Sequence, residues 1–219
     1  KSIGGEMVSL LAYYLLSPFN LLFLLIPRSS IAMGVTLLIF LKLFSCTVSF
    51  AVLLDVKFKQ RNMTAVLCAL SYGFMSYLSA NQFNVMWLDA LIGLPLIILG
   101  VDALLKHRNP LYYVIPLSIT ILSNYYTGYM ICLFLGFYFP YAFLETQGAF
   151  SWKEFGKQFC RFLFYSMIAV GLIMVILLPT FYSLLGSKGT ATTISLSFKS
   201  EYNPFLMLSK LFIGSFDFE

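Results

Sequence analysis

The chain has 219 residues, of which 60% are hydrophobic and only 11% are charged. Soluble domains carry about 25% charged residues, and several apolar segments of this chain approach the length that spans a bilayer. The composition therefore predicts an all-α, polytopic membrane protein and excludes an ordinary soluble domain. The net charge of +5 fits loop charges that set membrane topology. We expect no nucleic-acid partner, because no basic run interleaves with a soluble fold.

Residues 1–30 are predicted to hold interfacial helices. The apolar stretch 8–26 is long enough to span a membrane, but the sequence Ser-Pro-Phe-Asn at residues 17–20 interrupts it. Proline removes a helical hydrogen bond and disfavours a helical conformation at the residue before it. We therefore expect two short helices in or near the membrane interface, with Ser17 as a candidate cap. A single kinked span is the alternative.

Residues 31–181 are predicted to form a bundle of six transmembrane helices. Two of these helices fall short of the about 20 residues that a lipid-exposed span needs, so the loops that join them can sink into a cavity. Residues 182–219 turn polar and predict an outer loop that leads to further membrane helices. The six predicted spans are residues 31–54, 64–79, 90–105, 111–122, 129–144 and 162–178, with a pinched loop at 123–128.

Basic residues are concentrated in three loops on one side of the predicted bundle. The cations of the other side lie mostly in longer terminal segments, which weigh least in the positive-inside rule. We therefore expect the basic loops in the cytoplasm and the opposite polar segments, around Glu6, Asp89, Asn124 and Lys188, on the outer face. The basic loops contain Lys57, Lys59, Arg61, Lys106, Arg108, Lys153, Lys157 and Arg161, against Lys1, Arg28, Lys188, Lys199 and Lys210 on the other side.

Residues 81–90, Asn-Gln-Phe-Asn-Val-Met-Trp-Leu-Asp-Ala, place polar side chains beside a tryptophan between two apolar spans. Polar groups at the edge of a hydrocarbon layer are either solvated at the headgroup level or face a cavity. We interpret this stretch as an outward-facing loop beside an active-site cavity, with Asp89 as its strongest candidate for chemistry. The alternative for Asp89 is a helix N-cap that stabilises the free N–H groups of the apolar helix after it.

Four longer motifs follow one another along the chain. They are Tyr-Tyr-Leu-Leu-Ser-Pro-Phe-Asn at residues 13–20, Met-Trp-Leu-Asp-Ala at 86–90, Ser-Asn-Tyr-Tyr-Thr-Gly-Tyr-Met at 123–130 and Ser-Lys-Leu-Phe-Ile-Gly-Ser-Phe-Asp at 209–217. In this order they resemble the YfhO family of bacterial membrane proteins, and the resemblance runs over essentially the whole chain.

This resemblance implies a GT-C type glycosyltransferase, a multi-pass enzyme of the bacterial plasma membrane whose active site faces outward. Such enzymes take the sugar from a polyprenyl-phosphate donor. In Gram-positive bacteria, YfhO-like proteins are associated with glycosylating cell-surface polymers such as teichoic acids. GT-C enzymes also carry interfacial helices in their first outer loop, which matches residues 1–30. The family's expected catalytic Asp lies upstream of Gly4-Gly5-Glu6, so we expect this chain to lack it, together with the first membrane helix.

Glycosyl transfer from a lipid phosphate needs a base on the acceptor hydroxyl and stabilisation of the departing phosphate. A divalent cation such as Mg²⁺ or Mn²⁺, or a clamp of Lys and Arg, can supply that stabilisation. Asp89 is the predicted metal ligand and assisting catalytic carboxylate, and the resemblance agrees, because related enzymes place acidic residues in their second outer loop. Glu6 is the second catalytic candidate, sharing the metal or binding the sugar; a solvated loop charge is its alternative.

The remaining candidates are predicted to bind substrate. Lys42 lies mid-span, where a charge usually faces the bundle interior, and either binds the lipid phosphate or satisfies helix-end carbonyls. Lys188 and Lys199 flank an outer loop and can hold the donor phosphate as point charges. Hydrogen bonds to sugar hydroxyls are assigned to Asn81, Asn84 and Asn124, and stacking on a sugar or lining of the lipid groove to Trp87, Tyr125 and Tyr126. For each of these six, an aromatic belt with capped loop ends is the alternative.

Two other functions stay open. A flippase or transporter of a lipid-linked substrate would favour polar residues through the membrane midplane and internal repeats. Lys42 is the one charge clearly at mid-depth of the predicted spans, and no repeat is visible in the sequence, which favours the enzyme. A non-catalytic membrane subunit is the third interpretation, because the expected catalytic Asp lies upstream of these residues.

Overall fold

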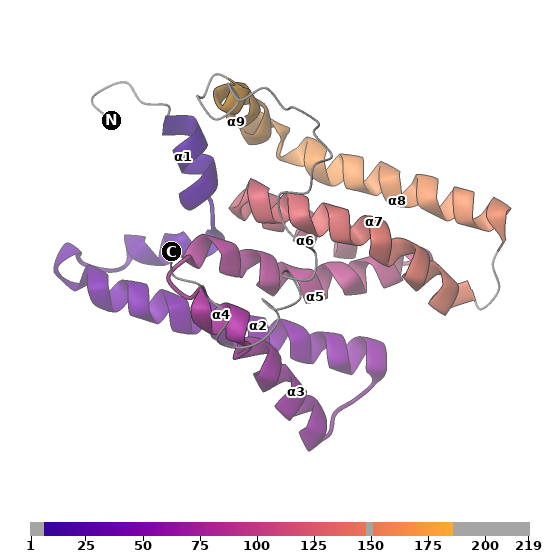
Figure 1. Ribbon diagram of the computed structural model, residues 1–219, viewed down its shortest axis with the longest axis horizontal. Coiled ribbons are helices and arrows are strands. Elements are labelled where there is room, and N and C mark those ends of the chain that lie inside the picture. Colours follow the sequence, from indigo (N-terminus) through magenta and orange to yellow (C-terminus); the bar gives the residue numbers. More distant parts are fainter. Residues whose placement is uncertain (1–6, 148–150, 186–219) are drawn as a thin grey trace, which may run out of the picture. The chain divides into compact units, whose positions relative to one another are not determined.

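The computed structural model describes residues 7–147 and 151–185, and every regular element among them is helical, which confirms the all-α prediction. Residues 186–219 lie outside the described residues, so the predicted outer loop at 182–219 lies almost wholly outside them. The elements shown in Figure 1 are α1 (Met7–Tyr14), the short 3-10 helices η1 (Pro18–Leu24) and η2 (Arg28–Ser30), α2 (Ile31–Phe58), α3 (Met63–Gly73), α4 (Ser76–Ala80), α5 (Val85–Leu105), α6 (Leu111–Ser123), α7 (Tyr125–Gln147), α8 (Trp152–Leu172) and α9 (Met174–Leu185).

Several of these helices are long and apolar enough to cross a membrane. Four single stretches meet that criterion, and α8 and α9, which meet at a bend of 74°, make a fifth if the bent pair is one span. The 13 residues of α6 are too few to cross about 30 Å of hydrocarbon at about 1.5 Å per residue. The chain is therefore a multi-pass membrane protein, as its composition predicts. The four stretches are Arg28–Phe58, Met63–Ala80, Val85–Leu105 and Tyr125–Gln147.

Two helices start earlier than the sequence analysis expects. α5 begins at Val85, so residues 85–90 of the polar stretch are helical and do not form a loop. α7 begins at Tyr125, and only Asn124 separates it from α6, so the predicted loop at 123–128 is wrong. The physical reason is a side-chain cap, because Asn124 Oδ1 accepts a hydrogen bond from the backbone N–H of Thr127 at 2.9 Å. One capping residue is enough to end one helix and start the next.

The predicted span 64–79 is a broken helix. α3 and α4 are separated at Phe74 and Met75. Just before the break, α3 approaches α2 closely at Gly73, where an added Cβ would lie only 1.9 Å from Thr47 Oγ1. Small residues at helix contacts give the close packing that holds membrane helices together, because lipid removes the hydrophobic driving force.

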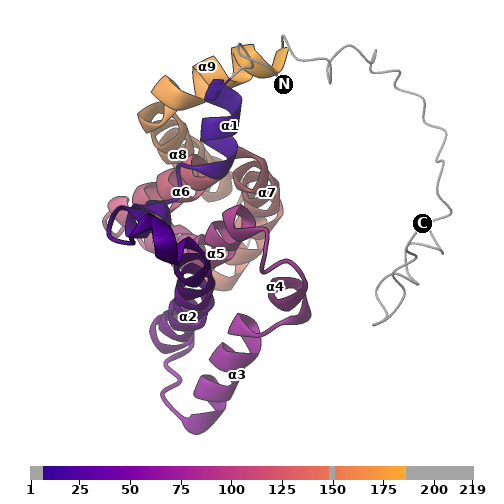
Figure 2. The same ribbon diagram turned by 90° about the vertical axis from the view of Figure 1, so that its left-hand side faces the viewer.

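α5 is the central helix of the described bundle. It packs against α2, α6 and α7, which lie around it in Figure 2. At Gly100 the backbone of α6 approaches directly, because an added Cβ would lie 2.6 Å from the carbonyl oxygen of Tyr112 and 2.6 Å from the Cα of Tyr113. The buried apolar core shared by α5, α6, α7 and α8 includes Ile97, Val101, Leu117, Leu135, Phe139 and Phe162.

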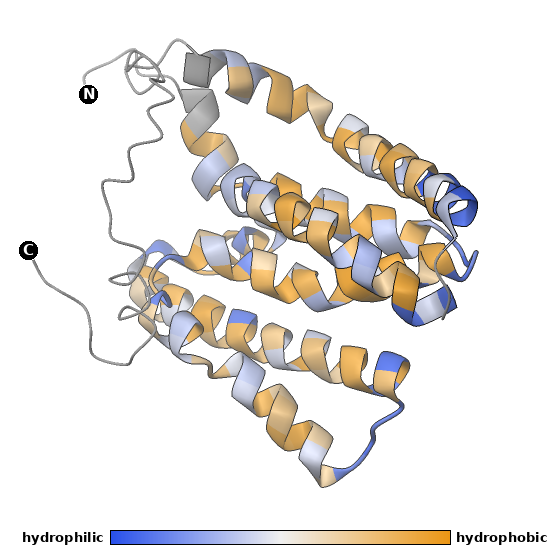
Figure 3. Cartoon of the chain, turned by 45° about the vertical axis from the view of Figure 1, so that its right-hand side comes forward, coloured by the Kyte–Doolittle hydropathy of each residue, from blue (hydrophilic) through white to orange (hydrophobic). Residues whose placement is uncertain are grey.

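Large hydrophobic side chains also cover the outside of the bundle. The side chains of Phe40, Phe137 and Met167 are 64%, 82% and 74% exposed. Figure 3 shows hydrophobic residues along the outward surfaces of the helices and hydrophilic residues gathered near turns and helix ends. Exposed apolar surface of this extent needs a nonpolar partner. The lipid bilayer is that partner for a chain with several membrane-crossing helices.

Two lysine–aspartate pairs join α2 to α5. Lys42 Nζ lies 2.8 Å from Asp89 Oδ2, and Lys57 Nζ lies 3.1 Å from Asp102 Oδ2. Each pair takes its lysine from α2 and its aspartate from α5, in the same order along both helices, so α2 and α5 run parallel. Along the axis of α2 and along that of α5, the two pairs are about 20 Å apart.

The second of these pairs lies at the end of the bundle where the basic loops gather. Lys57 Nζ also contacts Glu145 Oε2 of α7 at 2.8 Å. His107, just after α5, contacts Gln158 and Arg161 of α8. The three basic loops follow α2, follow α5 and precede α8, so these contacts place them at one common end. That this end faces the cytoplasm stays a prediction.

The short N-terminal helices show the expected interruption. α1 ends at Tyr14 and η1 begins at Pro18, so the proline follows a break between two helices, as predicted. Ser17 occupies the N-cap position of η1, but its side chain makes no capping hydrogen bond. Its hydroxyl oxygen instead accepts a hydrogen bond from Lys42 Nζ at 3.2 Å, so the predicted side-chain cap is wrong.

Candidate functional site

A buried ion pair lies at the end of the bundle opposite the basic loops. Lys42 is fully buried, and its ammonium group donates to Asp89 Oδ2 at 2.8 Å, to the Val85 carbonyl oxygen at 2.7 Å and to Ser17 Oγ at 3.2 Å. The ring centroid of Phe19 lies 5.5 Å from the same nitrogen, within cation–π range. An ammonium group has three donors, and all three are used. A lipid phosphate would therefore have to displace one of these partners to bind Lys42.

Asp89 retains hydrogen-bonding capacity at this site. Its side chain is 5% exposed, and Oδ1 is buried without a hydrogen-bond partner among the residues that the structure describes. Buried polar atoms normally have a partner, so Oδ1 is an acceptor that the described residues leave unsatisfied. Asp89 is the fifth residue of α5, which shows that the N-cap interpretation is wrong.

Tyr13 of α1 brings together predicted binding residues from two distant segments. Its hydroxyl accepts a hydrogen bond from Trp87 Nε1 at 3.1 Å, and its carbonyl oxygen accepts one from Asn124 Nδ2 at 3.1 Å. Its ring also packs edge-on against Tyr125, with the centroids 5.8 Å apart. The partners of Tyr13 are 74 and 111 residues away in the chain, so α1 is held against both α5 and the α6–α7 junction.

The side chain of Asn124 is used within the protein. It is fully buried, and its Oδ1 accepts hydrogen bonds from both the backbone N–H and the hydroxyl of Thr127, while its Nδ2 donates to Tyr13. The capped-loop alternative therefore describes Asn124 better than binding of a sugar hydroxyl does.

Asn81 and Asn84 lie between α4 and α5 and are half-buried. Asn81 Nδ2 donates to the carbonyl oxygen of Tyr77 at 3.0 Å, and Asn84 Nδ2 donates to Asn81 Oδ1 at 3.4 Å. The two amides thus form a local network just before α5, and Asn84 is three residues before Trp87 and five before Asp89. Their binding of sugar hydroxyls stays a prediction.

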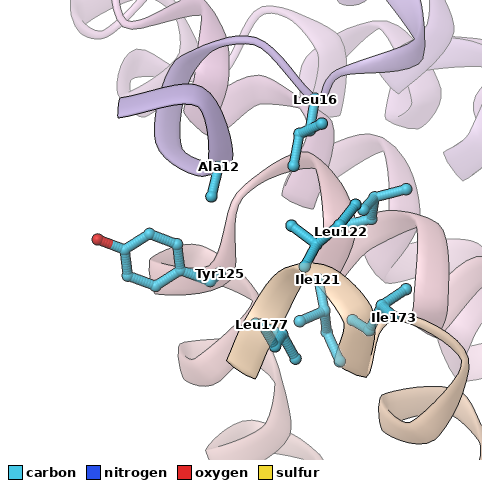
Figure 4. Close-up of a pocket in the computed structure, with 8 residues that line it drawn as sticks. Ala12, Leu16, Ile121, Leu122, Tyr125, Ile173 and Leu177 are labelled. Atoms are coloured by element: carbon cyan, nitrogen blue, oxygen red, sulfur yellow. The ribbon is translucent and has the colours of Figure 1, made fainter. Parts of the chain in front are cut away.

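Tyr125 and Tyr126 have different surroundings. Tyr126 is 46% exposed on α7, whereas Tyr125 lines a cavity of about 10 Å³, room for about one water molecule. Figure 4 shows this cavity enclosed mainly by aliphatic side chains. A cavity of this size and character does not hold a sugar ring. Its other lining residues are Ala12, Leu16, Ile121, Leu122, Ile173, Ile176 and Leu177.

A larger groove, of about 230 Å³, lies along α2 and α5 between the two lysine–aspartate pairs. Its walls are apolar apart from Ser45 and Ser49, whose hydroxyls donate to backbone carbonyls of their own helix. The aromatic residues that the sequence analysis assigns to a lipid groove do not line it. The groove is lined by Phe44, Ser45, Val48, Ser49, Val52, Ile92 and Leu96.

Three predicted site residues, Glu6, Lys188 and Lys199, lie outside the described residues. Their assignments to catalysis and to phosphate binding stay predictions.

The described residues do not fit the predicted divalent cation. No group of three or more His, Cys, Asp or Glu side chains comes together within the described ranges. Asp89 has an ammonium group 2.8 Å away, whereas Mg²⁺ and Ca²⁺ sites are built from several oxygen ligands. Glu6 lies outside the described residues, so a Mg²⁺ or Mn²⁺ ion at Asp89 stays a prediction.

Several residues of the site and its surroundings were missed from the sequence. Tyr13 and Ser17 lie in the first family-like motif, at residues 13–20, and that motif was the available sign that they belong to the site. Neither side chain is charged, so composition did not single them out. Asp102 had a clearer signal, because an ionisable residue inside an apolar span is a functional or pairing candidate. His107, in the basic loop after α5, gave no signal in the sequence, and its ring lies 2.8 Å from the side-chain nitrogen of Gln158.

Together, the fold and the site define a multi-pass, all-helical membrane protein with a buried lysine–aspartate pair beside its short N-terminal helices. A family model described as "Bacterial membrane protein YfhO" matches residues 1–219, and the chain belongs to this family. It is similar to a curated protein of Bacillus subtilis (strain 168), named "Uncharacterized protein YfhO", with 26% identity over 99 residues. That match covers 45% of this chain and 11% of the relative. No solved structure matches the chain significantly.

Proposed function

We propose that the protein containing this chain is a GT-C type membrane glycosyltransferase. In this proposal it moves a sugar from a polyprenyl-phosphate donor to a cell-surface polymer such as teichoic acid on the outer face. Membership of the YfhO family supports the membrane location, and the family-like motifs support the enzyme class. The observation that carries the proposal is the free oxygen of Asp89, held in a fixed position next to Lys42 and Ser17.

The position of Asp89 suits a lipid-linked substrate. Asp89 is about 6 Å along the helix axis from the start of α5, close to the end of the bundle opposite the basic loops. A headgroup sugar at the membrane surface is within reach of that depth, whereas a substrate crossing the bilayer needs polar groups near the midplane. Between the two lysine–aspartate pairs, the α2–α5 groove is mostly apolar. This distribution favours a transferase over a flippase.

In the proposed reaction, the acceptor hydroxyl attacks the sugar carbon that carries the phosphate, and the lipid phosphate leaves with the bonding electrons. Asp89 Oδ1 accepts a hydrogen bond from a sugar or acceptor hydroxyl and so orients it for attack. Lys42 fixes the position of Asp89, because its ammonium group donates to Asp89 Oδ2, to the Val85 carbonyl oxygen and to Ser17 Oγ. The base that removes the hydroxyl proton is the upstream Asp that the family resemblance implies, so Asp89 acts as a positioning residue.

Replacing Asp89 with asparagine is expected to slow sugar transfer by about tenfold, because one hydrogen bond to the reacting group loses about 1.4 kcal/mol of transition-state stabilisation. The measurement is transfer of labelled sugar from a polyprenyl-phosphate donor by the full-length protein in membranes. Asp102→Asn is the matched control, since Asp102 is also buried, on the same helix and paired with a lysine of α2.

Asp102→Asn is expected to keep most of the transfer rate. Equal losses in the two variants would show that Asp89 acts only through stability and would contradict its proposed role. Transport of the lipid-linked sugar across vesicles, with no transfer to an acceptor, would instead identify a flippase and contradict the enzyme.

The outward orientation of the site predicts a labelling pattern. In a cysteine-free background, Phe83→Cys, in the exposed loop between α4 and α5, is expected to react with a membrane-impermeant maleimide on intact cells. Lys59→Cys, in the exposed loop after α2, is expected to react only after the membrane is permeabilised. The opposite pattern would place the basic loops outside and reverse the proposed orientation.

A further inference from the structure

Arg161 lies where α8 changes from a charged to an apolar segment. The helix opens with Trp152, Lys153 and Glu154, continues through Lys157, and carries no charge from Phe162 to its end. Tryptophan and cations at the start of an apolar helix are typical of the headgroup level of a membrane. Arg161 is the last cation before the hydrocarbon segment, so its guanidinium lies at that level.

The side chains that contact this arginine are not carboxylates. Arg161 Nη1 contacts His107 Nδ1, and the guanidinium carbon lies 5.8 Å from the ring centroid of Tyr165. The other ring nitrogen of His107, Nε2, lies 2.8 Å from the side-chain amide of Gln158, which is 3% exposed. A guanidinium N–H can only donate, so Nδ1 of His107 is the acceptor in its contact with Arg161.

The other cations held by side chains in this bundle have carboxylate partners. Lys42 pairs with Asp89, Lys57 with Asp102 and Glu145, and Arg61 with Asp55. Within residues 7–147 and 151–185, no carboxylate lies within ion-pair distance of Arg161. Its orientation is thus set by the protein while its charge is left uncompensated by the described residues. An ordered, uncompensated guanidinium is an anion receptor.

More positive charge surrounds this receptor. Lys157 is four residues before Arg161 and therefore on the same face of α8. Lys106 and Arg108 flank His107 in the chain, and the backbone of His107 takes the left-handed conformation, with φ of 54°, that turns the chain after α5. None of these three lysine and arginine side chains has an ion-pair partner in the described part of the chain.

We propose that Arg161 binds the phosphate of an anionic phospholipid headgroup, with Lys157 and Arg108 adding positive charge around it. The planar fork of an arginine matches two phosphate oxygens, which gives this site geometry as well as charge. Basic pockets between membrane helices recognise phosphate-bearing headgroups in this way. His107 serves as a positioning residue, because it fixes the guanidinium before the lipid arrives.

The test measures lipid binding to the full-length protein in detergent by native mass spectrometry. Dioleoylphosphatidylglycerol is titrated against dioleoylphosphatidylcholine. The wild-type protein is expected to retain phosphatidylglycerol preferentially, and Arg161→Gln to weaken that binding by about tenfold, the loss of one charge-assisted hydrogen bond. His107→Ala is expected to weaken it by a smaller factor without removing a lysine or arginine.

Lys59→Gln is the matched control, because Lys59 is an exposed cation of a basic loop without an ion pair among the described residues. It is expected to bind phosphatidylglycerol as the wild type does. Equal losses of phosphatidylglycerol binding in Lys59→Gln and Arg161→Gln would show diffuse electrostatic attraction and overturn the site. Unchanged phosphatidylglycerol binding by His107→Ala would overturn the positioning role of His107. Displacement of the lipid by inorganic phosphate at equal concentration would identify a free-anion site instead.

A second variant guards against a folding failure of Arg161→Gln. Arg161→Lys keeps the charge but loses the planar fork, so phosphatidylglycerol binding is expected to fall between that of the wild type and Arg161→Gln. Wild-type binding by Arg161→Lys would contradict recognition by the arginine geometry.

Discussion

Replacing Lys42 with methionine is expected to lower the free energy of unfolding by about 3–5 kcal/mol, the range seen when one partner of a buried ion pair is removed. Methionine fills much of the space of the lysine stem, so packing changes little. Asp89 is left as a buried charge without its ammonium partner, and the Val85 carbonyl oxygen loses its donor. Equilibrium unfolding of the full-length protein in mixed dodecyl maltoside and SDS micelles measures the effect.

The double variant Lys42→Met with Asp89→Leu separates structure from chemistry. Apolar replacement of both partners is expected to recover most of the stability, because no buried charge is left unpaired. Its rate of sugar transfer is expected to stay low, since the oxygen of Asp89 is gone. A double variant as unstable as Lys42→Met would show that the ion pair is not the source of the loss. Lys59→Met, at an exposed position, is the control and should stay within about 0.5 kcal/mol of the wild type.

Replacing Gly100 with alanine is expected to lower the free energy of unfolding by about 2–3 kcal/mol through overpacking. The added methyl group would lie 2.6 Å from both the Tyr112 carbonyl oxygen and the Tyr113 Cα. Both are backbone atoms, so the clash is relieved only by moving α6 away from α5. The same micelle unfolding experiment measures the loss.

Gly136→Ala on α7 is the matched control, because nothing lies within 4 Å of a Cβ added there. It is expected to be neutral or to stabilise by up to about 1 kcal/mol, since alanine favours the helix over glycine. A loss at Gly136 as large as that at Gly100 would mean that glycine flexibility, and not the close contact of α5 with α6, explains the sensitivity.

The sequence predicts the membrane class and the main helices because those depend on local composition. Apolar runs of sufficient length mark α2, α5 and α7, and the proline after Ser17 marks the break between α1 and η1. Loop charges also predict which turns share one end of the bundle. This prediction is confirmed by Lys57, near the end of α2, which contacts Asp102 near the end of α5 and Glu145 near the end of α7.

The candidate site is less predictable because it depends on which helices touch and in which register. Lys42 and Asp89 are 47 residues apart, and no local pattern pairs them. Asp89 also looks like a helix start in the sequence, since polar residues precede it and an apolar run follows. The structure instead starts α5 at Val85, whose carbonyl oxygen accepts a hydrogen bond from Lys42. Two residues later, the indole of Trp87 donates to the Tyr13 hydroxyl.

The two lysine–aspartate pairs restrict how the bundle can change shape. They lie about 20 Å apart on parallel helices, so sliding α2 along α5 by one turn, about 5.4 Å, would break both pairs at once. Shear between these two helices is therefore strongly resisted. The helix breaks lie elsewhere in the described bundle, at Phe74 and Met75 between α3 and α4 and at the 74° bend between α8 and α9. We therefore expect α2 and α5 to move as one rigid unit in any change of shape, with bending confined to the helix breaks.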